Sequence, residues 1–555
     1  MPRMTGATAL IEMLQAEGVS YVFGNPGTAE SAIIDALERA PELVYVLAVQ
    51  EGAAMGMADA YARITGKVAF VNLHIDSGLA NGISLLTNAY EGGTPLILSS
   101  ANKDVRKLAE GRFDLHRVAE QFTKWSVEVT HPEQVPSVVR RAFTIAKTPP
   151  TGPVYLSFAA NALEDEGEMD IVPSAPGYPE VRPDQAAIEA AGAILEGATQ
   201  PVLIVGDRVG LAGGASEAVR LAELTGARVY ATNLGRVNFP TSHPQYLGTI
   251  NPTMPGARAA LADADAVVVA GAAFAGFFHF AGRSLPNARL IHIDADPDAV
   301  GRSEPTEVGI VASPRAGLAD LAAELETRLG GEQREAAAIR AATVAEQKAA
   351  QRQAWQQRLE QRWDVSPMST ERMMTELARA LPDDALFVDD SITTRASVYG
   401  ALDFDEPDDL VGIAGGALGW GMGGALGAKL ARPERPVVCV VGDGSAMMTI
   451  QALWTAAASK IPVVYVVCNN ESYRILKLNM NVWQTQIVGR PEPQTSYLGM
   501  DFGVPFDIAA IANGFGVRGR RIEDPAELGP ALTEAIAANE PVVLDVRIDG
   551  AISSA

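Results

Sequence analysis

The sequence predicts an α/β protein of three domains, each built on a parallel sheet of the Rossmann-like kind. The chain has 555 residues, too long for one hydrophobic core and suited to about three domains of ordinary size. Apolar runs of strand length alternate with helical patterns in its first, middle and last parts, as in βα units. Hydrophobic residues make up 48% and charged residues 20%, which is typical of globular proteins.

The N-terminal domain is predicted to span residues 1–175. Apolar residues recur at helical spacing from 9 to 14, and the alternation that follows predicts strands at 21–23, 44–47, 68–73 and 96–98 and helices at 51–64 and from 81. A Pro-rich stretch at 172–179 ends the domain and reads as a linker.

The central domain is predicted to span residues 183–330. Its apolar runs predict strands at 201–206, 266–271 and 290–294. No Gly-x-Gly-x-x-Gly pattern follows the first strand, so the sequence does not predict a dinucleotide there. The segment 331–366 is rich in Ala, Gln, Glu and Arg, and we expect it to be an exposed helical connector.

The C-terminal domain is predicted to span residues 367–555. A short apolar strand at 437–441 ends at Gly442, and a helix over 447–459 leads to a second strand at 461–468 that ends at Asn469 and Asn470. A last strand is predicted at 542–546.

Charge and cysteine content exclude several function classes. A net charge of −23 argues against nucleic acid or an anionic membrane as partner, because both require basic patches. Cys439 and Cys468 lie inside predicted strands, which favours buried thiols in a reducing compartment. With no signal-peptide pattern at the N-terminus, we expect a cytoplasmic protein.

One uncharged stretch, residues 412–428, approaches the lower limit of about 17 residues for a transmembrane helix. Its eight glycines favour instead a closely packed loop and helix at a cofactor.

The turn after the strand at 437–441 predicts a diphosphate site. Gly442 and Gly444 allow close backbone approach to an oxyanion, Ser445 adds a hydroxyl, and the following helix directs its N-terminus to the same place. Asp443 and Asn470 end neighbouring strands, where open α/β sheets bind ligands.

Together with a backbone carbonyl near Ser472, Asp443 and Asn470 would offer Mg²⁺ three oxygen ligands. Gly-Asp-Gly-Ser alone is also a common turn, and the Asn-Asn after the next strand is what favours the site.

The Gly-Asp-Gly-Ser turn at 442–445, followed by residues 452–457 and by the Asn-Asn pair at 469–470, resembles the signature of the thiamin-diphosphate-dependent enzymes. The resemblance covers essentially the whole chain and lies nearest to the benzoylformate decarboxylases within the 2-oxo acid decarboxylase and acetolactate synthase superfamily. It implies thiamin diphosphate and Mg²⁺ as cofactors, a pyrimidine-binding N-terminal domain and a diphosphate-binding C-terminal domain. It also implies a homodimer or homotetramer with active sites at the subunit boundary. Some relatives hold FAD in the central domain, and nothing in this sequence demands it.

The resemblance assigns roles to further residues. Glu51 matches the glutamate that hydrogen-bonds the cofactor's aminopyrimidine, although an acid in the first turn of a helix is also common. Thr28 matches a hydroxyl that meets the substrate carboxylate, in what is otherwise an ordinary Asn-Pro-Gly turn. His74 matches a decarboxylase histidine, and His279 lies near the second one if a one-residue insertion is allowed. Histidines in such settings are also often only packed.

Gly416 and Leu418 match the segment that bends the cofactor, with the Gly416 carbonyl as acceptor and Leu418 as the wedge between its rings. A leucine is more often plain core.

The predicted function is decarboxylation of a 2-oxo acid to an aldehyde. The first alternative is a carboligase or lyase that makes or breaks carbon–carbon bonds, and the presence of His74 argues against it. The second is a non-catalytic member of the family, and the presence of Glu51 argues against it. Leu476 suits an apolar pocket, whereas Arg474 and Lys477 suit a second anionic group on the substrate. The substrate therefore stays open at this point.

Overall fold

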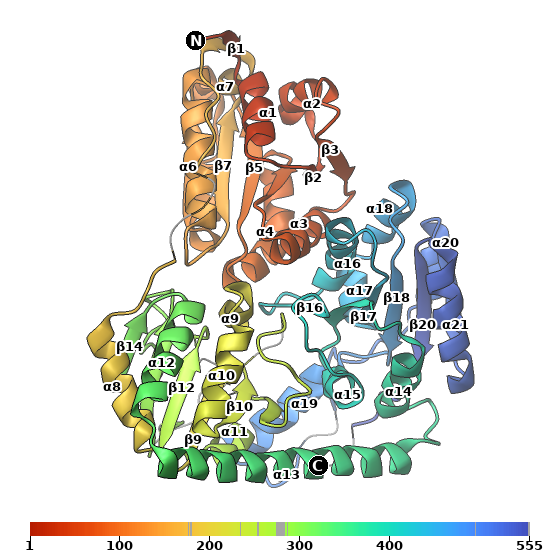
Figure 1. Ribbon diagram of the computed structural model, residues 1–555. Helices are drawn as coiled ribbons and strands as arrows, with labels where there is room; N and C mark the ends of the chain where they lie inside the picture. Colours follow the sequence, from red (N-terminus) through yellow and green to blue (C-terminus); the bar gives the residue numbers. More distant parts are fainter. Residues whose placement is uncertain are drawn as a thin grey trace.

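The computed structural model describes residues 1–175, 177, 180–232, 235–251, 255–273, 284–285, 287–493 and 496–552. Within these residues three parallel six-stranded sheets form N-terminal, central and C-terminal domains, which confirms the predicted fold class (Figure 1). In the same residues no helix is long and apolar enough to cross a membrane.

The first candidate residues lie at the carboxyl ends of the strands of the N-terminal sheet. Its strands lie in the order β3 (Val44–Leu47), β2 (Tyr21–Asn25), β4 (Ala69–Leu73), β5 (Leu96–Asn102), β7 (Val154–Ala159) and β6 (Trp125–Val129). The helices include α1 (Gly6–Ala16), α2 (Ser31–Glu38), α3 (Glu51–Thr65), α4 (Ile75–Glu91) and α6 (Val135–Lys147), and β1 (Arg3–Thr5) pairs with β8 (Glu166–Glu168). Helix α4 begins directly after His74, earlier than the predicted start at residue 81.

The central sheet has the order β11 (Tyr246–Thr249), β10 (Arg228–Ala231), β9 (Pro201–Val205), β12 (Ala266–Ala270), β13 (Arg289–Asp294) and β14 (Val308–Val311). Helices α8 (Gln185–Glu196), α10 (Ala215–Thr225) and α12 (Pro314–Arg328) accompany it. The predicted connector is one long helix, α13 (Gly331–Arg362), which runs beneath the central and C-terminal domains in Figure 1.

The C-terminal sheet has the order β16 (Leu410–Gly412), β15 (Leu386–Asp390), β17 (Val437–Gly442), β18 (Val464–Asn469), β20 (Val542–Arg547) and β19 (Arg518–Ile522). Its helices include α14 (Thr370–Ala380), α15 (Arg395–Ala401), α16 (Trp420–Ala431), α19 (Arg474–Val482), α20 (Ile508–Gly514) and α21 (Pro525–Ala538).

The helix predicted over 447–459 is instead two short helices, α17 (Asp443–Met448) and α18 (Ala452–Ala458). The chain leaves helical geometry at Thr449, whose hydroxyl donates to the carbonyl of Gly419 (2.5 Å). This tertiary bond accounts for a break that helical periodicity did not predict.

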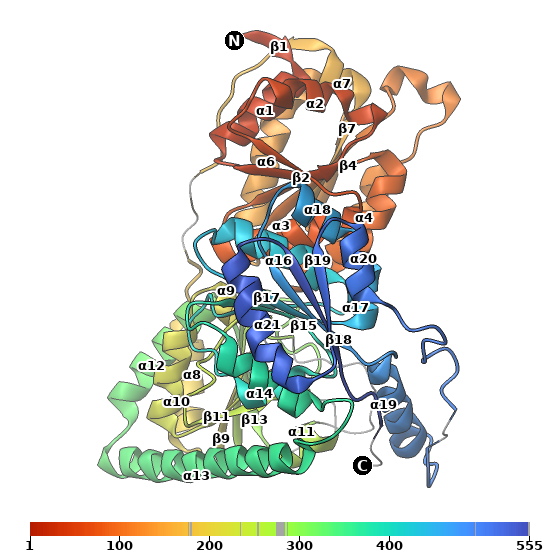
Figure 2. The same ribbon diagram turned by 90° about the vertical axis from the view of Figure 1, so that its right-hand side faces the viewer.

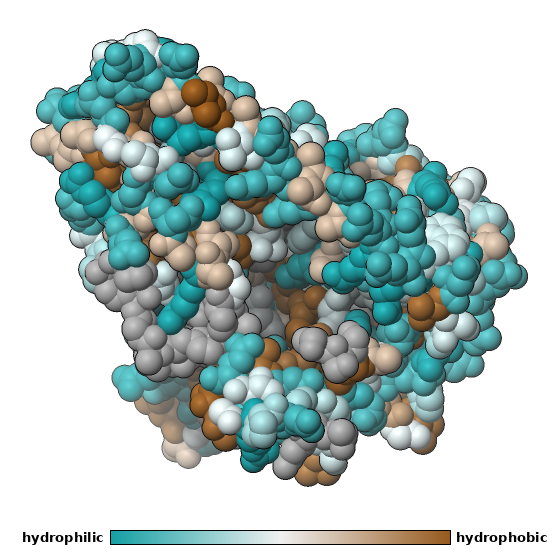
Figure 3. All heavy atoms as spheres, turned by 90° about the horizontal axis from the view of Figure 1, so that it is seen from below, coloured by the Kyte–Doolittle hydropathy of each residue, from teal (hydrophilic) through white to brown (hydrophobic). Residues whose placement is uncertain are grey.

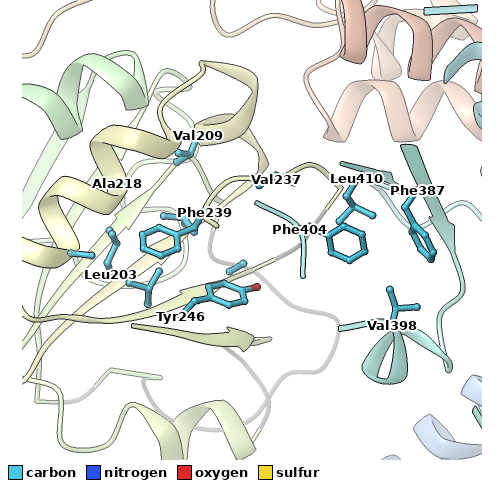
Figure 4. Packing of buried hydrophobic residues seen from close by; sticks show 14 of the residues in the cluster. Leu203, Val209, Ala218, Val237, Phe239, Tyr246, Phe387, Val398, Phe404 and Leu410 are labelled. Carbon is cyan, nitrogen blue, oxygen red and sulfur yellow. The ribbon is translucent and has the colours of Figure 1, made fainter. Parts of the chain in front are cut away.

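Apolar packing joins the domains. Tyr246 and Phe239 of the central domain belong to the same buried cluster as Phe404 and Leu410 of the C-terminal domain (Figure 4). Seen from the side, the N-terminal domain sits above the C-terminal domain, with α3 and α16 between them (Figure 2).

Helices α3 and α16 meet backbone to backbone. A β-carbon added at Gly423 would lie 2.4 Å from the carbonyl oxygen of Ala53, and one at Gly427 would lie 2.0 Å from that of Met57. Only glycine fits such an approach. The indole of Trp420 donates to the buried carboxylate of Asp59 (2.6 Å), so a polar bond fixes this apolar contact. Since Glu51 opens α3, the contact also fixes the position of Glu51 relative to the C-terminal domain.

Candidate active site

Glu51 is held at the start of α3 by two amide side chains. Asn25 donates Nδ2–H to Oε1 and Asn81 donates Nδ2–H to Oε2, each at 3.0 Å. The carboxyl is nearly buried, at 8% exposure, and lies in the first turn of a helix, where the helix dipole favours negative charge. The two hydrogen bonds fix the orientation of the carboxyl. Because each oxygen keeps a lone pair, the carboxyl can still bind a ligand.

His74 lies at the N-cap of α4 and is oriented by a glutamate that the sequence analysis missed. Its Nδ1 lies 2.7 Å from Oε2 of Glu30, while Oε1 of Glu30 accepts from the backbone N–H of Ile75 (3.1 Å) and Ala101 (3.0 Å). Glu30 is fully buried, whereas the His74 side chain is one-third exposed. Because the carboxylate accepts the Nδ1 proton, the free nitrogen Nε2 faces away from it and can exchange a proton with a substrate.

The turn before Thr28 is pressed against the same imidazole. A β-carbon at Gly27 would lie 1.9 Å from Nδ1 of His74, so glycine is required at this position. Thr28 follows and is exposed. The structure therefore brings Glu51, His74 and Thr28 together at one edge of the N-terminal sheet, within one group that also contains Asn25 and Glu30.

The second group of candidate residues lies where β17 and β18 end. Asp443 is buried and accepts from the backbone N–H of Gly444 (2.8 Å), Asn470 (3.0 Å) and Glu471 (2.7 Å). Asn470 in turn accepts through Oδ1 from the N–H (3.0 Å) and hydroxyl (3.2 Å) of Ser472. These bonds join the two loops that the sequence analysis placed at one metal.

The chain adopts a left-handed conformation at Glu471 (φ 58°), which is unusual for a residue other than glycine. This conformation turns the N–H of Glu471 toward Asp443, and the Glu471 carboxylate forms an ion pair with Arg547.

The surroundings of Asp443 fit a cation and an anion bound side by side. Burial raises the pKa of its carboxyl to about 6, because the charged form loses water. Among the described residues Asp443 has no Lys, Arg or His in ion-pair contact, so a divalent cation would supply the missing positive charge. A β-carbon at Gly442 would meet no atom within 4 Å, which leaves open space beside the turn for a phosphate group.

Ser445 and the loop 415–419 lie next to this turn. The hydroxyl of Ser445 donates to the buried carboxylate of Asp390 (2.6 Å) and accepts from the N–H of Gly419 (2.8 Å). The hydroxyl therefore ties two loops together, and its contact with diphosphate stays a prediction. Gly416 is exposed and Leu418 is half-buried against the core, as suits an acceptor and a wedge.

Arg474 and Lys477 are both bound within the chain. Lys477 pairs with Asp501, and Arg474 donates to the carbonyl of Ala551 from Nε (3.2 Å) and Nη2 (3.0 Å). Both cations therefore have partners within the chain, and their contact with a second anionic group on a substrate stays a prediction. His279 lies outside the described residues.

Backbone hydrogen bonds join the two strand ends at the point of the central sheet where a dinucleotide would bind. In the strand order 3-2-1-4-5-6 this point lies between β9 and β12. There Gly206 donates to the carbonyl of Ala270 (2.9 Å) and Arg208 to that of Gly271 (3.3 Å). The described residues give FAD no particular support.

Comparison with known proteins decides the family. Three family models match in chain order: the thiamine pyrophosphate enzyme N-terminal TPP binding domain at residues 4–122, its central domain at 188–321, and its C-terminal TPP binding domain at 394–546. The chain is 31% identical to benzoylformate decarboxylase of Pseudomonas aeruginosa over 97% of this chain and 98% of that protein.

The chain belongs to the thiamine pyrophosphate enzyme family. It is also 29% identical to a probable acetolactate synthase large subunit of Methanocaldococcus jannaschii, over 99% of this chain and 92% of that protein. A solved thiamin diphosphate-dependent 4-hydroxybenzoylformate decarboxylase of Rhodococcus jostii superposes with a TM-score of 0.85 at 29% identity, covering 98% of this chain and 99% of that one.

Within this family the two groups of candidate residues fall in the two TPP binding domains. Thr28, Glu51 and His74 lie in the N-terminal match, and the turn at Asp443 with Asn470 lies in the C-terminal match. The family therefore supports thiamin diphosphate as the ligand of these domains, and both decarboxylases and carbon–carbon bond-forming enzymes are among the relatives.

Proposed function

We propose that this protein is a thiamin-diphosphate- and Mg²⁺-dependent decarboxylase that converts a 2-oxo acid to an aldehyde and CO₂. The observation that carries the proposal is the Glu30–His74 pair (2.7 Å). It sets an oriented imidazole beside Thr28 and Glu51, at the edge of the sheet where the cofactor's pyrimidine would lie. Bound thiamin diphosphate would supply the electron sink for loss of CO₂.

The residues of this chain have distinct tasks in the proposed reaction. Thr28 binds the substrate carboxylate, and Glu51 holds a proton at the aminopyrimidine. His74 gives and accepts protons at the carbon that becomes the aldehyde. His279 is proposed as a second proton carrier by family resemblance.

In the C-terminal domain the carboxylate of Asp443, the amide oxygen of Asn470 and a carbonyl at Ser472 would bind Mg²⁺. Gly442, Gly444 and Ser445 would line the diphosphate, while Gly416 and Leu418 would hold the organic part of the cofactor.

We further propose a cytoplasmic homodimer or homotetramer with each active site at a subunit boundary. Apolar side chains exposed on both domains support association: Leu108 and Phe113 in the N-terminal domain, Trp483 and Leu498 in the C-terminal domain. Seen from below, the surface is mostly hydrophilic and apolar residues gather around a central hollow (Figure 3).

A carboligase is the second candidate function, because an acetolactate synthase is similar over nearly the whole chain. The two reactions would differ in what is added after CO₂ is lost: a proton in decarboxylation to an aldehyde, and a second carbonyl compound in carboligation. The oriented imidazole of His74 favours protonation.

A substrate panel tests the proposal. Aromatic, aliphatic and dicarboxylic 2-oxo acids are supplied with thiamin diphosphate and Mg²⁺, and CO₂, aldehyde and carboligation products are measured with and without a second aldehyde. We expect stoichiometric aldehyde and CO₂ from an acid with an apolar side group. Dicarboxylic acids should react at least about tenfold more slowly, because burying an unpaired charge costs more than 1.4 kcal/mol. Carboligation products without free aldehyde would favour the second candidate.

A further inference from the structure

Helix α4 of the N-terminal domain holds a loop of the C-terminal domain through one buried side chain. Asn88 lies near the end of α4 and is fully buried. Its Nδ2–H donates to the carbonyl of Ala417 (2.7 Å), and its Oδ1 accepts from the N–H of Ala417 (3.0 Å). One amide thus satisfies both backbone groups of a residue in another domain, as a neighbouring strand would.

The loop 415–419 depends on such bonds because it has little structure of its own. Three of its five residues are glycines, and glycine loses more backbone conformational freedom on folding than any other residue. Gly419 is fixed by Ser445 at its N–H and by Thr449 at its carbonyl. Asn88 performs the same task at Ala417, between exposed Gly416 and half-buried Leu418.

Contact with Asn88 is also tight at the start of the loop. A β-carbon at Gly415 would lie 2.4 Å from Oδ1 of Asn88. The loop is therefore packed on this side chain as well as hydrogen-bonded to it.

Asn88 shares a helix face with a residue of the candidate active site. Asn81 and Asn88 are seven residues apart in α4, and a spacing of seven, about two turns, returns to the same face of a helix. Along this face α4 carries the amide that holds Glu51 (3.0 Å) and the amide that holds Ala417, and His74 lies at the N-cap of the same helix.

We propose that Asn88 is a positioning residue that keeps the loop 415–419 in the conformation that receives the organic part of thiamin diphosphate. The inference rests on the proposed function for the identity of the ligand. Asn88 acts by preorganisation: if the competent loop conformation is populated only in part, the measured affinity falls by that fraction. The carboxylate of Asp443 in the diphosphate turn is held by backbone N–H groups of Gly444, Asn470 and Glu471, and Asn88 makes none of these bonds.

Calorimetric titration of the cofactor-free protein with two ligands tests the inference. Thiamin diphosphate with Mg²⁺ engages the loop and the turn, whereas inorganic pyrophosphate with Mg²⁺ engages the turn alone. For Asn88→Ala we expect affinity for thiamin diphosphate to fall roughly tenfold, since two hydrogen bonds are lost. Affinity for pyrophosphate should stay within about twofold of wild type. Asn88→Leu, which fills most of the lost volume, should behave in the same way if the alanine variant folds poorly.

Asn161→Ala is the matched control. Asn161 is also buried and also binds two backbone groups, donating to Thr130 (2.7 Å) and accepting from Val105 (3.1 Å), but within the N-terminal domain. It should lose stability as Asn88→Ala does and keep the wild-type ratio of the two affinities.

An equal loss for both ligands in both Asn88 variants, or no loss for either, would overturn the inference. If the wild type itself fails to bind thiamin diphosphate, the proposed function is contradicted and the inference falls with it.

Discussion

Replacing Glu51 with glutamine is expected to lower 2-oxo acid turnover by about 10³-fold, or roughly 4 kcal/mol in barrier height. The carboxyl is fixed by Asn25 and Asn81, and glutamine preserves its shape and volume. The amide cannot donate and accept a proton as the carboxyl does, so proton transfer at the aminopyrimidine is what is lost. Thiamin diphosphate should still bind.

The measurement separates chemistry from folding and binding. Deuterium exchange at C2 of the bound cofactor should slow in Glu51→Gln, while its melting temperature stays near that of the wild type. Glu38→Gln, an exposed glutamate at the end of α2, serves as the control and should change neither. Wild-type exchange in Glu51→Gln would remove this residue from the reaction.

His74→Ala should slow decarboxylation by about 10² to 10⁴, the usual contribution of a general acid–base group. Cofactor affinity should change little, because the imidazole is placed to touch the substrate and not the diphosphate. Steady-state rates and calorimetric titration of thiamin diphosphate give the two quantities. If the His74→Ala enzyme decarboxylates at the wild-type rate, the carboligase becomes the favoured function in place of the decarboxylase.

Glu30→Gln is the companion variant to His74→Ala. It keeps the buried shape but loses the charged acceptor for Nδ1, so we expect a smaller loss of about tenfold. A loss as large as that of His74→Ala would mean that Glu30 does more than orient the ring.

Much of the fold could be predicted from the sequence, because the signal for a strand lies within a short continuous segment. That signal is an apolar run of strand length that ends in Gly, Asp or Asn. The strand before Gly442 and the placement of Asp443 and Asn470 at neighbouring strand ends are examples. The break at Thr449 was missed because its cause, the bond to Gly419, joins residues far apart in the chain.

The site residues that were missed share the same origin. The role of Glu30 depends on its contacts with His74 and Ala101, and the role of Asn88 depends on its contacts with Ala417. Such side chains carry no local signal, since an acid after a turn and an amide in a helix are both ordinary. The partners of Arg474 and Lys477, which are Ala551 and Asp501, could not be predicted for the same reason, because they are distant in sequence.

Titration of the cofactor-free protein with thiamin diphosphate, with and without Mg²⁺, tests the central claim most directly. We expect tight binding and a raised melting temperature only when both are present, with a gain of roughly 3 kcal/mol at a hundredfold excess over the dissociation constant. Binding should weaken below about pH 6, because the Asp443 carboxyl has its pKa raised to about 6 and must lose its proton to bind the metal. Asp443→Ala should abolish the effect. No thermal shift in the wild type, or an equal shift in Asp443→Ala, would contradict a thiamin diphosphate and Mg²⁺ site built on this turn.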